Sequence, residues 1–475
     1  MGWSAGRAHP AVLAGRGRGS QIRLQQPPGL AVLFFTELWE RFAYYGMRAL
    51  LILYLIDTAT GGLGWSQERA SRLYGWFVGL TYLTPVAGGW LADRFLGTNR
   101  SLLVGGVILT LGYFSLALGT GLSFAAGLAL VAVGTGFFKA NVHTMVGQLY
   151  PPGDPRRDSG FTLYYMGINL GAFFGPLVCA WLAVRHGWSY GFGAAGSGMA
   201  VALLFYLWAR GESLRSVGLS PRRGAASAGP RLHTALTPAE RQRIMAIGLI
   251  TVFVVVFWLA YEQAGSSLNV FAARRTDRAA GEWLAWLAPN GEIPAAWFQS
   301  INPFFVLLLA PAVAGLWQRL GDRAPSTPAK MALGLILLGL AYAIMVAGAA
   351  QSDHGSLVSP WVLVAFYLIY TVGELCFLPV GISFVSQTAP PRLASMLMGI
   401  WLTANFVANL IGGYLAGMVQ PIERGEIFRV LGGPADFFLN FVVLCLGAGC
   451  LLGLLVPIIR RLMGGEPAPG VVQPT

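Results

Sequence analysis

Long apolar runs separated by short polar segments dominate this sequence. Each run is about 20 residues or longer, which is enough for a helix to cross about 30 Å of hydrocarbon. A backbone inside a bilayer must satisfy its hydrogen bonds internally, so the runs predict helices. The pattern predicts twelve spans, near residues 30–57, 72–95, 101–119, 122–149, 160–184 and 190–209, then 244–273, 298–320, 329–350, 357–387, 392–420 and 436–460.

A polar, arginine-rich stretch divides these runs into two groups of six. It contains SPRRGAASAGPR and has no apolar period, so it is predicted to be a cytoplasmic linker. Two six-span halves joined by such a linker are typical of a secondary transporter, with the substrate site near the midplane. The predicted organisation is a disordered cytoplasmic N-terminal tail (1–29), a six-helix bundle (30–209), the linker (210–243), a second six-helix bundle (244–460) and a cytoplasmic C-terminal tail (461–475).

Composition and charge agree with a polytopic membrane protein. Of the 475 residues, 55% are hydrophobic and only 11% are charged, whereas a soluble chain has about 25% charged residues. The net charge of +12 comes mainly from arginines in the N-terminal tail, the linker and alternate connections. By the positive-inside rule these segments and both termini are expected on the cytoplasmic side of the cell (inner) membrane. The segment 272–283 fits less well, because it carries three arginines on the predicted outer side.

The first span carries ionisable side chains on one face. Its polar residues follow the spacing i, i+3, i+4, i+7 and i+11, which places them together on a helix: Glu37, Glu40, Arg41, Tyr44 and Arg48. A charged residue at the bilayer centre costs roughly 2.5–3.5 kcal/mol. This face is therefore expected to look into the bundle or into a water-filled cavity.

Three more ionisable residues fall inside predicted spans, namely Lys139, Glu262 and Glu374. With the first span they make four carboxylates against three bases, so one proton would neutralise the set, as in a proton-carrying site. Any single buried pair could instead only hold helices together. A functional role accounts better for the whole set, because buried ion pairs are often no more stabilising than packed apolar residues.

The segment TELWERFAYYGMR (36–48) resembles the Glu-x-x-Glu-Arg-Phe signature of the proton-dependent oligopeptide transporters (POT), a branch of the major facilitator superfamily. GGWLADRFLGTNR, with Asp93, Arg94 and Gly97, is similar to the general superfamily loop motif. The resemblance runs from about 28 to 415 and implies an all-α, twelve-helix fold. Further blocks resemble the family in the same order: GTGFFKANV (134–142), FTLYYMGINLGAFFGPL (161–177), FWLAYEQAGSSLN (257–269), WFQSINPFFVLLLAP (297–311) and GELCFLPVG (373–381).

The resemblance implies a symporter that imports di- and tripeptides with protons and needs no cofactor and no metal. It implies a gate formed by Arg48 and Glu262 on the external side. The residues implied in proton coupling are Glu37, Glu40, Arg41, Lys139 and Glu262. Those implied in substrate binding are Arg48, Tyr44, Tyr45, Tyr82, Lys139, Asn169, Trp258, Glu262, Asn302, Glu374 and Trp401.

The chain departs from the family pattern at three positions. Ala140 stands where proline is usual, which predicts a straighter helix near Lys139. His143 replaces a small polar residue one turn from Lys139 and adds a group that can titrate near neutral pH, although a hydrogen-bonded helix histidine is the plainer interpretation. Leu378 stands where serine is usual. The linker is too short for two extra helices, so twelve spans are expected rather than fourteen.

The sequence also bears on functions other than peptide symport. An enzyme is not indicated, because the sequence has no His-Glu-x-x-His, Gly-x-Ser-x-Gly or P-loop pattern. The basic stretches lack the interleaved aromatic residues that bind nucleic acid. A transporter of another solute, such as nitrate, another anion or an amino-acid-like drug, and a non-transporting nutrient receptor both remain alternatives. A monomer in the lipid bilayer is expected, because one chain can supply the whole site.

Overall fold

The computed structural model describes residues 25–151, 153–211, 213–214, 217–218, 236–282, 284, 286–352, 356–390, 393–427 and 429–463. Most of the predicted tails (1–29 and 461–475) and much of the predicted linker (210–243) lie outside these residues. Within the described part, twelve helices have 20 residues or more: α1 (Pro28–Ile56), α2 (Gln67–Leu91), α3 (Thr98–Ala117), α4 (Gly121–Gln148), α5 (Arg157–His186), α6 (Trp188–Ala209), α7 (Pro238–Tyr261), α9 (Ile301–Leu320), α10 (Thr327–Ser352), α11 (Pro360–Thr388), α12 (Ala394–Gly417) and α14 (Pro434–Leu462).

The all-α membrane fold predicted from the sequence is confirmed. Ten helical segments are long and apolar enough to cross a membrane, and α1 and α2 complete the twelve. The helices α1 and α2 are less apolar than these ten, because α1 carries four charged side chains and α2 carries tyrosines, threonines and glycines. Two short helices, α8 (Ser267–Arg275) and α13 (Val419–Glu423), are too short to span.

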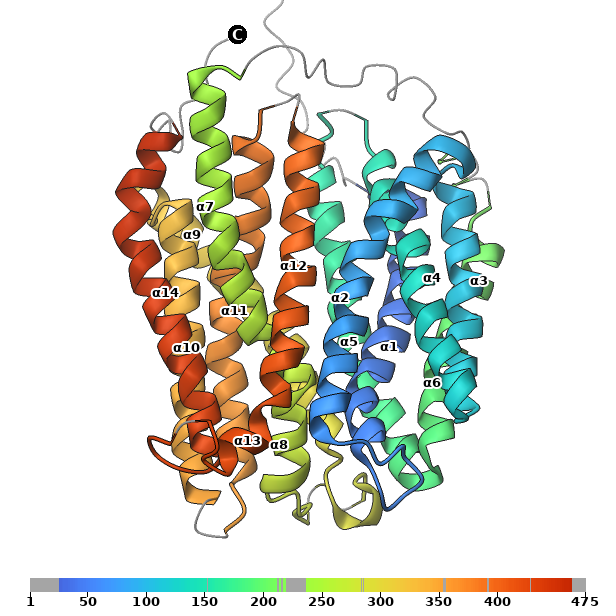
Figure 1. Ribbon diagram of the computed structural model, residues 1–475. Coiled ribbons are helices and arrows are strands. Elements are labelled where there is room, and N and C mark those ends of the chain that lie inside the picture. The colour runs from blue at the N-terminus through green and yellow to red at the C-terminus, as the bar shows by residue number, and fades with distance from the viewer. Residues whose placement is uncertain are drawn as a thin grey trace, which may run out of the picture.

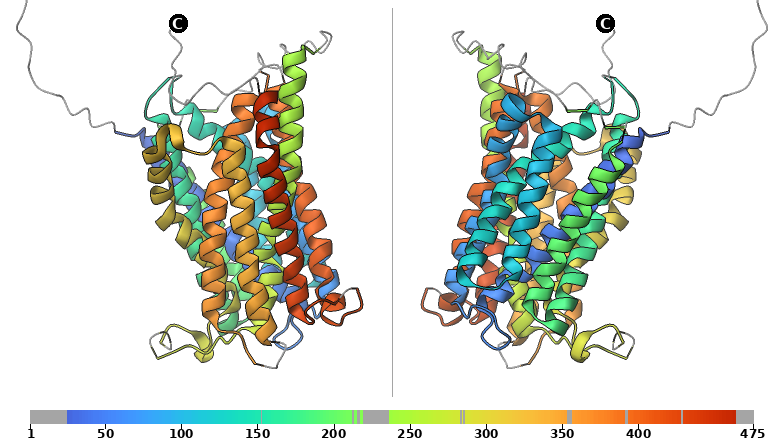
Figure 2. Two further views of the ribbon diagram at one scale, coloured as in Figure 1. Left: turned by 90° about the vertical axis from the view of Figure 1, so that its left-hand side faces the viewer. Right: turned by 90° about the vertical axis from the view of Figure 1, so that its right-hand side faces the viewer.

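The long helices form two bundles that stand side by side (Figure 1). One bundle contains α1 to α6 and has its own apolar core, which includes Leu51, Val131 and Met199. The other contains α7 to α14 and a second core, which includes Leu335 and Phe377. We call the face at which α1 begins and α14 ends the terminal face, and the other end the opposite face. Both views of Figure 2 show α7 reaching beyond its neighbours at the terminal face.

The seventh predicted span differs from the observed helix at both ends. The helix α7 begins at Pro238, inside the range predicted as linker, because Thr237 and Glu240 form a reciprocal capping box that starts it. The predicted span 244–273 is then interrupted by a 3₁₀ turn, η2 (Glu262–Gly265), before α8 begins. This interruption places Glu262 between the two bundles instead of on a continuous helix.

The two bundles contact each other along the middle and the opposite face. Gly75 of α2 lies so close to α12 that a Cβ built on it would be 2.6 Å from the Asn409 carbonyl oxygen. On the other side of the interface, Ser300 donates a hydrogen bond of 2.7 Å to the Phe173 carbonyl oxygen of α5. Among the described residues, no hydrogen bond or ring contact joins the bundles at their terminal-face ends. The bundles are thus closed together at the opposite face.

Candidate functional site

The predicted charged face of α1 is buried, and it begins with a carboxylate–guanidinium cluster. Glu37 and Glu40 are fully buried, and only 4% of Arg41 is exposed. The Arg41 Nε atom lies 3.1 Å from a Glu37 oxygen and also donates to Glu40. Both Glu37 oxygens and one Glu40 oxygen have no further hydrogen-bond partner. Two carboxylates therefore share one guanidinium, which leaves this cluster short of one positive charge.

Two turns further along α1, Arg48 reaches across to the other bundle. Its guanidinium donates to the Glu262 carboxylate and, through Nε, to the Tyr74 hydroxyl at 2.7 Å. The other Glu262 oxygen accepts a hydrogen bond of 3.1 Å from Tyr82. Close approach is possible because the chain has glycine at 265, where a Cβ would lie 1.8 Å from the Tyr74 oxygen. The predicted gate residues are thus in direct contact.

Lys139 lies next to this group without pairing with a carboxylate. Its Nζ atom is 4.3 Å from the centre of the Tyr82 ring, a distance at which an ammonium is attracted by the ring face. Within the described residues Lys139 forms no ion pair with Glu37 or Glu40. Tyr82 also donates a hydrogen bond to Glu262, and the charges of Arg41, Glu40 and Glu37 act on Lys139 as well, so Lys139 lies between the gate residues and the Arg41 cluster.

The second bundle contributes a carboxylate that has no basic partner. Asn302 donates to a Glu374 oxygen at 2.7 Å and to the Thr371 hydroxyl at 3.0 Å. Only 5% of Glu374 is exposed, and no ion pair to it is formed within the described part of the chain. A buried carboxylate without a base favours either a bound cation or a bound proton.

Arg48, Glu262 and Glu374 line one cavity of about 210 Å³ between the bundles. Five other residues predicted for the substrate site also line it: Tyr45, Tyr82, Asn169, Trp258 and Asn302. Leu378, at the position where the family usually has serine, also lines the cavity. Asn169 donates to the Tyr165 carbonyl oxygen of its own helix. The predicted residues are therefore brought together from α1, α2, α5, α7, η2, α9 and α11.

Three predicted site residues lie elsewhere. Tyr44 is buried and its hydroxyl is 3.1 Å from the Thr81 hydroxyl. Trp401 is buried against Gly381, at which a Cβ would be 2.8 Å from the indole ring. Lys139, described above, is likewise absent from the cavity lining. In this conformation Tyr44 and Trp401 do not wall the cavity, because their neighbours within the bundles cover them. Lys139 is only partly buried and lies over the Tyr82 ring.

Five aromatic or polar residues that line the cavity were not predicted from the sequence, namely Tyr165, Tyr261, Tyr367, Tyr370 and Gln299. Tyr261 and Tyr370 stack with ring centres 4.6 Å apart, and the Tyr261 hydroxyl is 3.4 Å from Asn302. A signal for Tyr165 was present, because it shares the helix face of Asn169 at the spacing i, i+4. Tyr261 directly precedes Glu262 and could have been included on that ground.

The superfamily loop motif lies at the terminal face between α2 and α3. A π-helical turn, η1 (Ala92–Leu96), contains Asp93 and Arg94 and ends at Gly97, whose φ is +78°. Glycine suits this left-handed conformation because it has no Cβ. The Arg94 guanidinium lies 5.5 Å from the centre of the Trp90 ring.

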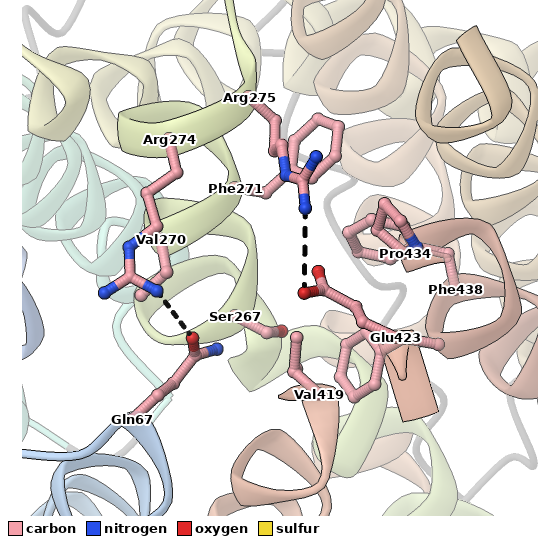
Figure 3. Close-up of a pocket in the computed structure, with 11 residues that line it drawn as sticks. Gln67, Ser267, Val270, Phe271, Arg274, Arg275, Val419, Glu423, Pro434 and Phe438 are labelled. Atoms are coloured by element: carbon pink, nitrogen blue, oxygen red, sulfur yellow. Dashed lines mark hydrogen bonds and ion pairs between the residues drawn. The ribbon is translucent and has the colours of Figure 1, made fainter. Parts of the chain in front are cut away.

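A smaller cavity of about 70 Å³ lies at the opposite face (Figure 3). Arg274 reaches across to Gln67 of the first bundle, with a hydrogen bond of 3.2 Å. Arg275 points towards Glu423 of α13, with 3.8 Å between nitrogen and oxygen. Both arginines of α8, two of the three in the segment 272–283, therefore have polar neighbours at this closed face.

Comparison with known proteins identifies the family. A model described as the POT family matches residues 99–216 and 224–430, which is more than half of the chain. The chain belongs to the POT family.

Relatives of this POT-family chain match over nearly their whole length. It is 34% identical to the peptide transporter YePEPT of Yersinia enterocolitica subsp. palearctica serotype O:3 (strain YE-P4), covering 94% of this chain and 97% of the relative. It is 31% identical to a di-/tripeptide transporter of Lactococcus lactis subsp. cremoris, covering 92% and 97%. A crystal structure of a peptide transporter POT in complex with sulfate superposes with a TM-score of 0.81 at 33% identity, covering 92% and 96%. This POT-family chain is thus a multi-pass membrane transporter and not an enzyme.

Proposed function

We propose that this chain is a proton-coupled symporter that imports di- and tripeptides by alternating access. The observation that carries the proposal is the pair of opposite charges on two sides of one cavity. Arg48 stands in one bundle, and the unpaired Glu374 stands in the other. A peptide is a zwitterion with a positive and a negative end, so it matches such a site. The named relatives are peptide transporters, which supports the same substrate class.

In the proposed binding mode, the amino group of the peptide meets Glu374 and Asn302. Its carboxylate meets Arg48, once that guanidinium is released from Glu262, and Lys139. Charge-assisted hydrogen bonds at both ends replace the water that each terminus loses. The tyrosine and tryptophan rings between the two ends contact side chains by area and π-faces, so they discriminate weakly among peptides.

The proposed coupling begins with a proton from the external side. Protonation of Glu262 removes the negative charge that holds Arg48, so the guanidinium becomes free for the peptide carboxylate. The Glu37, Glu40 and Arg41 cluster, with two acids on one base, is the second place where a proton is held. Loss of protons to the cytoplasm restores the ion pairs and expels the peptide. The charges therefore make peptide and proton movement depend on each other.

The proposed topology places the terminal face in the cytoplasm and the opposite face outside. Closure at the opposite face then corresponds to a cytoplasm-facing state, and rocking of the two bundles around the cavity would expose the site to the other side. One chain holds every residue of the cavity, so a monomer is the proposed transporting unit. The proposed location is the cytoplasmic (inner) membrane.

Blocked peptides test the two-ended recognition. Uptake of labelled dialanine into proteoliposomes is measured in the presence of unlabelled dialanine, N-acetyl-dialanine, dialanine amide or nitrate. Only the free dipeptide is expected to compete strongly, because each blocked form lacks one of the two charges. Equal competition by the blocked peptides, or competition by nitrate alone, would overturn the proposal.

A further inference from the structure

His143 lies on α4 one turn beyond Lys139, towards the terminal face, and its side chain is exposed. Its Nδ1 atom is 2.8 Å from the Lys139 carbonyl oxygen. A carbonyl oxygen only accepts hydrogen bonds, so Nδ1 carries the proton in the neutral ring. The other nitrogen, Nε2, then has a free lone pair, and no hydrogen bond to it is formed within the described part of the chain. The local geometry therefore presents a base at the cytoplasm-proximal end of the site.

His143 is also connected to the buried carboxylates. Its ring packs edge-on against Tyr164 of α5, with ring centres 5.2 Å apart. The Tyr164 side chain is buried, and its hydroxyl lies beside Glu37 without a hydrogen bond of good geometry. Tyr164 thus stands between an exposed imidazole and a fully buried acid. The charged groups that act on the imidazole are Lys139 on its own helix and Arg41 and Glu40 on α1.

We propose that His143 is the proton-release group of this transporter, positioned between the Glu37, Glu40 and Arg41 cluster and cytoplasmic water. This inference rests on the proposed symport function. In the proposed step, the O–H bond of a protonated Glu37 or Glu40 breaks and its proton passes through water to Nε2. The imidazolium then gives the Nε2 proton to cytoplasmic water and returns to the neutral ring. Repulsion by the nearby Lys139 and Arg41 charges drives this last step.

The variant His143→Ser tests the step, because serine can make the same bond to the carbonyl oxygen four residues earlier but cannot take up a proton. Thr144→Ala is the matched control. The Thr144 hydroxyl, one residue further along α4, donates a hydrogen bond of 2.9 Å to the Ala140 carbonyl oxygen. Proton-driven dipeptide uptake and peptide counterflow are measured in proteoliposomes at internal pH values from about 5.5 to about 8.

For His143→Ser we expect driven uptake to fall about 3- to 10-fold near neutral internal pH, with a changed internal-pH profile and counterflow within about 2-fold of wild type. Thr144→Ala should match wild type in both assays. An unchanged rate and profile in His143→Ser would overturn the proposal. If wild type itself shows no protonophore-sensitive uptake, the symport function fails first, so the two failures are distinguishable.

NMR gives a second test that does not depend on transport. If His143→Ser does not fold, His143→Gln takes its place in this comparison. The chain has five histidines, and NMR of the ¹³C-histidine-labelled protein in nanodiscs resolves their ring signals. The signal that disappears in the variant should shift between about pH 4 and about pH 8. A signal that stays constant over this range would contradict a proton-carrying role.

Discussion

Arg48 of α1 donates a hydrogen bond to Glu262 at the start of η2, and this contact joins the two bundles through a buried ion pair. Breaking one partner of a buried pair leaves an uncompensated charge, which costs about 3–5 kcal/mol. The same contact is easily opened by a proton on Glu262, because the neutral acid no longer holds the guanidinium. In the proposed mechanism, this buried pair between the two bundles is therefore a closure that depends on protonation.

The variant Glu262→Gln mimics the protonated acid permanently. We expect proton-driven uptake of dipeptide to fall at least about 10-fold, because the variant has lost a protonation step, while counterflow is retained. The two assays on the same proteoliposome preparation measure this difference. Equal loss in both assays would show that the pair is needed for folding or binding and not for coupling.

The variant Glu40→Gln tests the cluster around Arg41. Removing one of two carboxylates that share a guanidinium should abolish gradient-driven accumulation and leave peptide counterflow within about 2-fold of wild type. Glu68→Gln is the control, because Glu68 pairs with Arg72 at 2.5 Å but both side chains are about half exposed. That surface pair should contribute little. Unchanged driven uptake in Glu40→Gln would contradict a coupling role.

Sequence patterns predicted the helices well and the side-chain partners less well. The period of apolar residues predicts where a helix runs, and the cost of buried charge predicts that the polar face of α1 looks inward. Neither signal indicates which base faces which acid. Lys139 was expected to act with the Glu37 and Glu40 carboxylates; among the described residues it forms no direct ion pair with either and lies over the Tyr82 ring, because rotamers and the distance between helices decide such contacts.

The break after α7 shows a second limit. The segment around Glu262 is apolar enough to continue a span, yet Ser266 leaves the helical conformation, with φ −120° and ψ −94°. Gly265 is required there by the close approach of Tyr74 from the other bundle. A requirement that arises between segments far apart in the sequence leaves no local pattern, so the interruption could not be predicted from one sequence.

The variant Glu374→Gln tests recognition of the amino group. The loss of a charge-assisted hydrogen bond costs about 1.5–3 kcal/mol, so the apparent KM for dialanine should rise about 10- to 150-fold. Asn302→Ala, which removes a neutral donor to Glu374, should have a smaller effect. The KM from initial rates of uptake measures both. An unchanged KM in Glu374→Gln would place the amino group elsewhere.

The close contact of α2 with α12 predicts that a larger residue there prevents the two bundles from closing at the opposite face. A Cβ on Gly413 would lie 2.7 Å from the Ser71 carbonyl oxygen and 2.8 Å from the Gly75 Cα atom. Gly413→Ala should therefore keep the bundles apart at the opposite face and reduce both driven uptake and counterflow at least about 10-fold. Gly399→Ala, on the same helix with no atom within 4 Å of the added Cβ, is the control. Normal counterflow in Gly413→Ala would show that this contact can open without loss of transport.

Asp57 at the end of α1 predicts a pH-dependent contribution to stability. Partial burial raises the pKa of its carboxyl, but hydrogen bonds from Thr60, Trp188 and the Ala59 and Gly62 amides outweigh burial, so the pKa is lowered from 3.8. A lowered folded-state pKa gives stability that is present above the unfolded value and is lost as the pH falls through the folded value.

The variant Asp57→Asn should accordingly lower the apparent Tm by about 1–4 °C near neutral pH. The difference from wild type should be constant down to about pH 5 and shrink below about pH 4. Thermal unfolding of both proteins in the same detergent measures it. A difference that grows as the pH falls would contradict the assignment.

The central claim is that peptide and proton cross together, and accumulation of a labelled dipeptide tests it most directly. Proteoliposomes containing the wild-type chain are given an inward proton gradient with an inside-negative potential, and uptake is followed with and without a protonophore. The account predicts an internal dipeptide concentration above the external one that the protonophore abolishes. Uptake that only equilibrates, or accumulation that the protonophore leaves unchanged, would contradict it.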